Sequence, residues 1–195
     1  MINSENDKLL SDVDLKKKQL RKCISELKKC LSNNEKEERS LIITEKIETF
    51  SEFQSSENVL LYSSLPDEVF TGEALKRWFG IKKIFLPVVV GDILKIKEYD
   101  PAKMEIGSFG ILEPDGEELV DIDDIDLMII PGVAFDKSCN RLGRGKGYYD
   151  KLLSNVRSTK IGICYDCQIT DSIPVNDFDV TLDYVVTESL ILKNK

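Results

Sequence analysis

The 195-residue chain contains no histidine. This absence excludes every mechanism that depends on an imidazole: Ser-His-Asp and Cys-His nucleophiles, His-ligated zinc or non-haem iron, and histidine acid–base catalysis near neutral pH. Any chemistry must therefore use carboxylates, Lys, Arg, Tyr, backbone amides or a hard metal ion.

Long apolar runs are also missing. Stretches such as residues 127–130 are strand-sized and far shorter than the ~20 residues that cross a bilayer. The first residues lack the basic and apolar regions of a signal peptide, so we expect a cytoplasmic protein without a membrane partner. The formal net charge of −8 argues against a nucleic-acid partner.

Cysteine is scarce as well. Five cysteines, an odd number, make a disulfide framework unexpected. Cys164 and Cys167 form a C-x-x-C, which is compatible with half a zinc site or a redox pair. Residues 160–165 read as a strand, however, and a three-residue offset on a strand points two side chains to opposite faces. We therefore favour small buried residues over a paired site.

Helical spacing of apolar residues predicts a helix over residues 9–31 and a second one from Glu35 to about Phe53. Short apolar runs then alternate with loops and helices. They predict strands at 59–62, 83–86 (ended by Pro87), 93–99, 127–130, 161–164 and 184–186, with helices at 71–78, capped by Thr71, and at about 148–156.

Strands without polar alternation, separated by helices, indicate a mainly parallel sheet with helices on both faces. We therefore predict a single three-layer α/β domain over residues 1–195, in which a helical pair at about 9–53 comes first. Ligands bind such sheets at the carboxyl ends of the strands. The loops after Tyr62, Ile130 and Cys164 are therefore the candidate ligand loops.

Charge is unevenly distributed along the chain. Residues 91–130 hold twelve acids against three bases, a balance of −9, whereas residues 131–160 hold seven bases against two acids, a balance of +5. The basic segment contains Asn140-Arg-Leu-Gly-Arg-Gly-Lys-Gly-Tyr-Tyr-Asp150. Glycines allow close backbone approach, and a following helix N-terminus favours an anion. The acidic run at 121–126 is assigned to solvent.

The common phosphate motifs do not match this segment. Gly147 follows Lys146 where a P-loop has Ser or Thr, and the spacing G-x-G-x-G differs from the dinucleotide fingerprint. On spacing alone, phosphate binding is favoured over a merely solvated loop.

Residues 131–136 together with 140–150 closely resemble the hallmark segment of the 5-formyltetrahydrofolate cyclo-ligase (methenyltetrahydrofolate synthetase) family. Weaker matches follow in the right order at residues 17–21, 63–68, 109–114 and 173–179, so the resemblance extends from about Asp14 onward. Phe178 departs from the pattern, because many bacterial relatives carry histidine there.

The resemblance implies a fold similar to sugar-phosphate isomerases and CoA transferases, and the cytoplasmic one-carbon reaction of ATP and 5-formyltetrahydrofolate to ADP, phosphate and 5,10-methenyltetrahydrofolate. It implies a phosphorylated formyl (iminium phosphate) intermediate and a requirement for Mg²⁺, and we expect a monomer. Phosphoryl transfer of this kind needs positioning and charge neutralisation, and it needs no histidine.

By resemblance, Arg144 and Lys146 are the catalytic cations, and Arg144 is the first choice for the transferring phosphate. The residues that the resemblance assigns to ATP binding are Lys17, Lys18, Gln19, Leu20, Arg21, Arg141, Leu142, Gly143, Arg144, Gly145, Lys146, Gly147, Tyr148 and Tyr149. The resemblance assigns folate binding to Ser63, Glu68, Phe109 and residues 144–148. It assigns Mg²⁺ binding to Asp150 and Asp179.

Each assignment has a structural alternative. Lys17 and Arg21 share a helix face but stand among other lysines, as on a solvated basic face. The alternative for Asp150 is a charge at a helix N-terminus, and the alternative for Asp179 is an Asx-turn residue. Glu68 is also compatible with a loop carboxylate, and Phe109 and Tyr148 with half-buried aromatics. For the whole chain, the alternatives are a non-catalytic folate- or nucleotide-binding module and a sugar-phosphate isomerase that needs no ATP.

Overall fold

The computed structural model describes residues 11–107, 110–115, 122–154 and 156–195. Two helices come first, α1 (Asp12–Lys29) and α2 (Asn33–Glu48). Ser32 begins α2 by accepting a hydrogen bond from the backbone N–H of Glu35, whose carboxylate accepts one from the Ser32 N–H in return. This capping box satisfies two of the N–H groups that a helix start leaves without partners.

The single helix predicted from Glu35 to Phe53 is wrong. Helix α2 ends at Glu48, and a short helix α3 (Ser51–Ser55) follows it. Between them Phe50 has an extended backbone, and its ring packs edge-on against Tyr184 with 5.2 Å between ring centroids. Tertiary packing of this one aromatic ring thus accompanies the break in a segment whose local pattern is helical throughout.

The central sheet has the strand order β12-β11-β9-β6-β1-β2-β3. Strands β11, β9, β6, β1 and β2 run parallel to one another, while β12 and β3 pair antiparallel at the two edges. The strands are β1 (Asn58–Leu60), β2 (Lys83–Val90), β3 (Ile93–Glu98), β6 (Leu127–Ile130), β9 (Thr159–Ile163), β11 (Tyr184–Val186) and β12 (Ile191–Lys193). The predicted mainly parallel sheet is confirmed.

Strand β2 is longer than predicted, because Pro87 does not end it. Pro87 lies opposite Ile96 of β3, in the part of β2 that extends beyond its pairing with β1. Proline lacks an N–H and is tolerated where a strand has a neighbour on one side only. Pro87 was therefore misread as a strand end.

The two faces of the central sheet carry separate apolar clusters. On one face, α2, α3 and α4 (Gly72–Trp78) pack Ile43, Ile47, Phe53 and Trp78 onto the strands. On the other face, α5 (Tyr148–Leu153) contributes Leu153 beside Phe135 and Met128. Thr71 precedes α4 as predicted but does not cap it by a side-chain bond, because its hydroxyl donates to the Tyr62 carbonyl. Helix α5 ends at Leu153, earlier than predicted.

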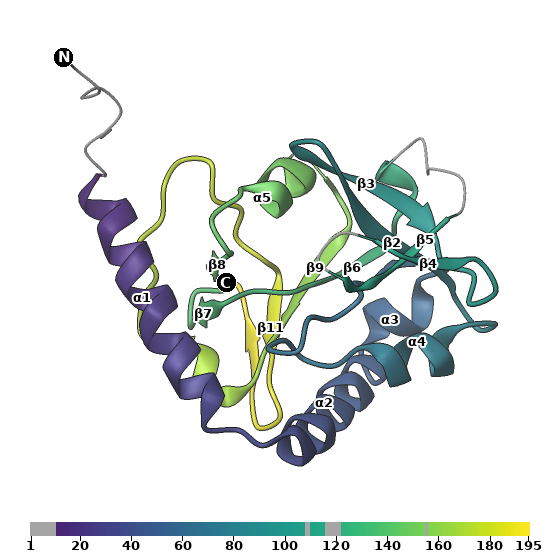
Figure 1. The fold of residues 1–195 in the computed structure, drawn as a ribbon, viewed down its shortest axis with the longest axis horizontal. Helices are drawn as coiled ribbons and strands as arrows, with labels where there is room; N and C mark the ends of the chain where they lie inside the picture. The colour runs from purple at the N-terminus through teal and green to yellow at the C-terminus, as the bar shows by residue number, and fades with distance from the viewer. Residues whose placement is uncertain (1–10, 108–109, 116–121, 155) are drawn as a thin grey trace.

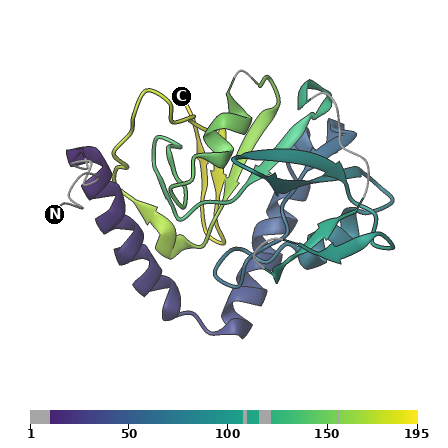
Figure 2. The ribbon, with the colours of Figure 1, turned by 45° about the horizontal axis from the view of Figure 1, so that its top comes forward.

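Short strands outside the central sheet were not predicted. Strands β7 (Ala134–Asp136), β8 (Arg141–Leu142) and β10 (Ile169–Thr170) form a small sheet, and β4 (Met104–Ile106) pairs with β5 (Leu112–Pro114). The described residues also include two single turns, η2 (Ile122–Asp124) and η3 (Asp166–Gln168). Helix α1 stands at the side of the molecule against the small sheet (Figures 1 and 2), where Ile24 and Leu20 pack with Ala134 and Leu142. Among the described helices, none is long and apolar enough to cross a membrane.

Gly162 of β9 offers a stability test of this packing. A Cβ there would lie 2.5 Å from Cε1 of Phe135 and 2.7 Å from Cδ1 of Leu182, so Gly162→Ala forces a buried ring to move. We expect a loss of about 1–3 kcal/mol in the free energy of unfolding, measured by urea titration with the fluorescence of buried Trp78. Gly72→Ala is the control, because a Cβ at Gly72 meets nothing within 4 Å. Equal midpoints for the two variants would contradict the packing argument.

Candidate functional site

A cavity of about 310 Å³ lies at the carboxyl ends of the central strands, where such sheets bind ligands. The loop after β1 supplies Leu65 and Glu68, and the segment after β6 supplies Pro131 and Gly132. The rest of the wall is the glycine-rich segment and the start of α5: Arg141, Gly143, Arg144, Lys146, Gly147, Tyr148, Tyr149 and Asp150. Two of the three candidate ligand loops therefore meet here, together with most of the hallmark segment.

Arg141 is buried in the cavity wall. Its Nη2 donates to Oδ1 of Asp150 at 2.6 Å, and its guanidinium carbon lies 5.4 Å from the centre of the Tyr149 ring. Its Nε is buried and has no hydrogen-bond partner within the described part of the chain. A buried donor without a partner costs free energy, so the hydrogen-bonding capacity of this guanidinium is not fully used within the described residues.

Glycines make room for Arg141 and shape the loop after it. A Cβ at Gly143 would lie 2.9 Å from Nη1 of Arg141, so a larger residue would displace the guanidinium. Gly145 and Gly147 have φ angles of 100° and 68°, in the left-handed region that glycine adopts at low cost. Helix α5, which starts after Gly147, has only six residues. The anion-binding potential therefore rests on the arginines and backbone more than on a long helix dipole.

Arg144 extends from this loop to two carboxylates of the loop after β1. Its Nη2 donates to Oδ1 of Asp67 at 2.5 Å and to Oε1 of Glu68 at 3.0 Å, and its Nε donates to the same Glu68 oxygen at 3.2 Å. Burial opposes the charge of Arg144, but the two carboxylates outweigh that effect and raise its pKa. The structure thus pairs Arg144, which is predicted to bind the transferring phosphate, with Glu68, which is predicted to bind the folate.

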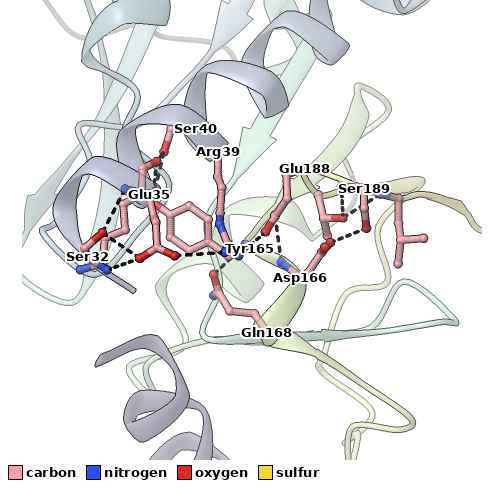
Figure 3. A network of polar contacts seen from close by, with 12 residues as sticks. Ser32, Glu35, Arg39, Ser40, Tyr165, Asp166, Gln168, Glu188 and Ser189 are labelled. Carbon is pink, nitrogen blue, oxygen red and sulfur yellow. Dashed lines mark hydrogen bonds and ion pairs between the residues drawn. The ribbon is translucent and has the colours of Figure 1, made fainter. Parts of the chain in front are cut away.

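The loop that carries Glu68 is bonded to a polar network around Tyr165, which Figure 3 shows. The hydroxyl of Tyr165 donates to the Glu68 carbonyl oxygen at 2.9 Å and lies 3.1 Å from Oγ of Ser40 in α2. Burial raises the pKa of Tyr165 to about 12, so the hydroxyl keeps its proton and remains a donor at neutral pH. Arg39 and Glu188 extend the network to the last β-hairpin through an ion pair of 2.7 Å.

Helix α1 brings its predicted cations to the same region. Nε of Arg21 donates to the carbonyl of Gly143 at 2.8 Å, and the buried ammonium of Lys17 forms an ion pair with Asp179. Burial lowers the pKa of Arg21, although Asp14 and Asp179 oppose the effect. Leu20 packs in the core against the small sheet, whereas Lys18 and Gln19 are exposed.

The two predicted metal ligands lie beside different cations. Asp150 accepts from Arg141, and Asp179 accepts from Lys17 and from the backbone N–H of Asn176. Across the described ranges, no group of three or more Cys, Asp or Glu side chains is arranged to hold a metal ion. Magnesium in nucleotide sites commonly takes one or two carboxylates and completes its shell with phosphate and water. Asp150 and Asp179 are carboxylates of that kind, each in an ion pair with a different cation.

The remaining predicted residues are placed as follows. Lys146 is exposed at the cavity, and the Tyr148 hydroxyl lies 3.5 Å from the Gly91 carbonyl in the β2–β3 turn. Ser63 is half-buried in the loop after β1. Phe109 lies outside the described residues. Cys164 and Cys167 are both free thiols, packed with the apolar clusters on opposite faces of the sheet.

Three polar residues at the site were missed from the sequence. Asp136 is buried and accepts hydrogen bonds from the backbone N–H groups of Ser138, Asn140 and Ile173, which fixes the β7–β8 turn. Lys28 and Asp67 form an ion pair of 2.6 Å beside Arg144. The one sequence signal for Asp136 is its place in the hallmark segment. Lys28 reads as one more lysine on a polar helix face.

The chain is similar to known proteins over nearly its whole length. Residues 13–188 match the model of the 5-formyltetrahydrofolate cyclo-ligase family. A probable 5-formyltetrahydrofolate cyclo-ligase of Schizosaccharomyces pombe is 32% identical over 93% of this chain and all of the relative. The 5-formyltetrahydrofolate cyclo-ligase of Mus musculus is 32% identical over 90% of this chain and 95% of the relative.

Solved structures give the same result. The 5,10-methenyltetrahydrofolate synthetase of Aquifex aeolicus superposes with a TM-score of 0.83 at 34% identity, covering 91% of this chain and 92% of that one. The synthetase of Mycoplasma pneumoniae superposes with a TM-score of 0.73 at 26% identity, covering 88% and 98%.

Proposed function

The chain belongs to the 5-formyltetrahydrofolate cyclo-ligase family and is a ligase with that family's function; from this premise we propose how its residues divide the reaction. The family's dependence on ATP suits the basic, glycine-rich cavity wall. The single observation that carries the assignment is the cavity wall, in which Arg141, Arg144 and Lys146 belong to one glycine-rich segment.

We propose that the triphosphate of ATP lies against Arg141, the residue 143–147 loop and the α1 cations Lys17 and Arg21. Arg141 lines the cavity, and Arg21 lies beside the loop through its bond to Gly143. The reduced folate would then enter over Glu68, Tyr148 and Ser63, with Phe109 against its ring by resemblance. Flat rings stack well on aromatic side chains, and a carboxylate accepts from pterin N–H groups.

The proposed reaction is a phosphoryl transfer followed by ring closure. The formyl oxygen forms a bond to the γ-phosphorus while the bond to ADP breaks, which gives the phosphorylated formyl group. N10 then bonds to the formyl carbon, phosphate leaves with the former formyl oxygen, and N10 loses its proton. Arg144 and Lys146 neutralise the charge that develops on the transferring group, because such transfers are catalysed chiefly by position and charge.

Mg²⁺, held by Asp150 and Asp179 together with the phosphates, would supply further charge neutralisation when bound. In that case Arg141 and Lys17, which pair with these aspartates, would hold the two carboxylates in place. We also infer the layer arrangement of sugar-phosphate isomerases and CoA transferases, a monomer and a cytoplasmic location; sedimentation at the mass of one chain tests the monomer.

The purified chain should form methenyltetrahydrofolate from 5-formyltetrahydrofolate only when ATP and Mg²⁺ are both present. The product absorbs in the near ultraviolet, and one phosphate should be released for each product molecule. Replacing ATP with an analogue that has a non-transferable γ-phosphate is the control. Binding of both ligands without product would favour the non-catalytic binding module, and product without ATP would refute the phosphoryl-transfer scheme.

A further inference from the structure

Asp67 lies between two cations that come from distant parts of the chain. Its Oδ2 accepts from Nζ of Lys28 at 2.6 Å, and its Oδ1 accepts from Nη2 of Arg144 at 2.5 Å. Lys28 belongs to α1, whereas Arg144 belongs to the glycine-rich loop. One carboxylate therefore connects the helix that carries Lys17 and Arg21 with the loop that carries Arg144.

The Lys28 side of this arrangement is fixed. The Lys28 side chain is 4% exposed, and its ammonium also donates to the Asp67 backbone carbonyl at 2.8 Å. A buried ammonium must keep its acceptors, because leaving a buried charge unpaired is costly. Lys28 thus holds both the backbone and the carboxylate of Asp67 in one place.

Few contacts other than those with Asp67 and Glu68 restrain the Arg144 side chain. The Arg144 side chain is 46% exposed, and the glycines at 143, 145 and 147 place few restraints on the backbone around it. Its guanidinium contacts Asp67 and Glu68. Glu68 is itself tied to the loop by the Leu65 N–H, which donates to Oε2 at 3.0 Å. The two carboxylates together fix the position of the guanidinium at the cavity.

We propose that Asp67 is a positioning residue, which uses buried Lys28 as an anchor to hold Arg144 where the transferring phosphate passes. The inference rests on the proposed function, in which Arg144 meets that phosphate. Asp67 itself touches neither the nucleotide nor the folate in this scheme. Small errors in the position of a catalytic group lower turnover steeply, while ground-state binding by the rest of the site is unaffected.

Asp67→Asn tests the proposal, because it keeps the shape and removes the charge. We expect kcat to fall about tenfold and the KM values for ATP and folate to stay within about twofold. The decisive measurement is a double-mutant cycle with Arg144→Ala. If Asp67 acts through Arg144, Asp67→Asn should cause no further loss of kcat in the Arg144→Ala background. Glu73→Gln, which breaks an exposed ion pair with Lys76, should leave kcat unchanged.

Lys28→Met approaches the same arrangement from the other side and should lower kcat severalfold. It also decides the question should Asp67→Asn fail to fold. Wild-type kcat in Asp67→Asn or in Lys28→Met would overturn the inference. A double variant whose loss of kcat equals the product of the two single losses would overturn it as well. Wild-type turnover in Arg144→Ala alone is a different result, because it would overturn the proposed role of Arg144 and with it the inference.

Discussion

Arg144→Ala should lower kcat by about 10²–10³-fold while the protein stays folded, because in the proposed reaction it removes the cation that neutralises charge developing in the transition state. The Arg144 side chain is 46% exposed, so its removal leaves no core cavity. Glu68 loses one partner but keeps the hydrogen bond from the Leu65 N–H. Steady-state kinetics with saturating ATP and folate measure the effect, and Trp78 fluorescence checks the fold.

Two further variants separate charge from geometry. Arg144→Lys keeps the positive charge but loses the planar fork that bonds to Asp67 and Glu68, and we expect it to recover little of the lost kcat. Arg157→Ala removes an exposed arginine from the same basic segment and should leave kcat unchanged. Turnover like that of the wild type in Arg144→Ala would refute the assignment, and an equal loss in Arg157→Ala would point to net charge instead.

The five parallel strands of the central sheet were predictable because burial on both faces leaves continuous apolar runs, whereas the edge strand β12 was not predicted. Residues 127–130 are apolar throughout and all buried in β6. Strands β7, β8 and β10, of two or three residues each, were not predicted. The prediction that a strand ends at Pro87 was wrong because a local rule about proline cannot tell whether a neighbouring strand is present.

The candidate site was likewise predictable from the sequence only in part. The cavity wall follows a continuous stretch of sequence, so the glycine-rich pattern and the excess of basic residues located it directly. The ion pairs join positions far apart in the chain, such as Lys17 with Asp179 and Lys28 with Asp67. No spacing rule relates such positions. For Lys17 and Asp179 the family resemblance brought both residues into the predicted site, whereas Lys28 and Asp67 became evident only from the fold.

Asp150→Ala should lower the free energy of unfolding by about 3 kcal/mol even when no Mg²⁺ is present, because it leaves a buried guanidinium without its carboxylate. The Arg141 side chain is 4% exposed, and its Nε already lacks a partner among the described residues. Asp150→Asn keeps an acceptor oxygen and should cost less. Urea titration of each variant measures the effect, with Asp171→Ala as the control, since the carboxylate of Asp171 is 96% exposed in its ion pair with Lys137.

Added phosphate separates the two roles that Asp150 has in the proposed function. If the unpaired Arg141 of Asp150→Ala forms an anion site, inorganic phosphate should raise the stability of this variant more than that of the wild type, by mass action on the folded state. Turnover should not return, because a phosphate held by Arg141 would occupy the place proposed for the triphosphate of ATP. A stability equal to that of the wild type would contradict the buried ion pair, and full turnover would contradict the metal assignment.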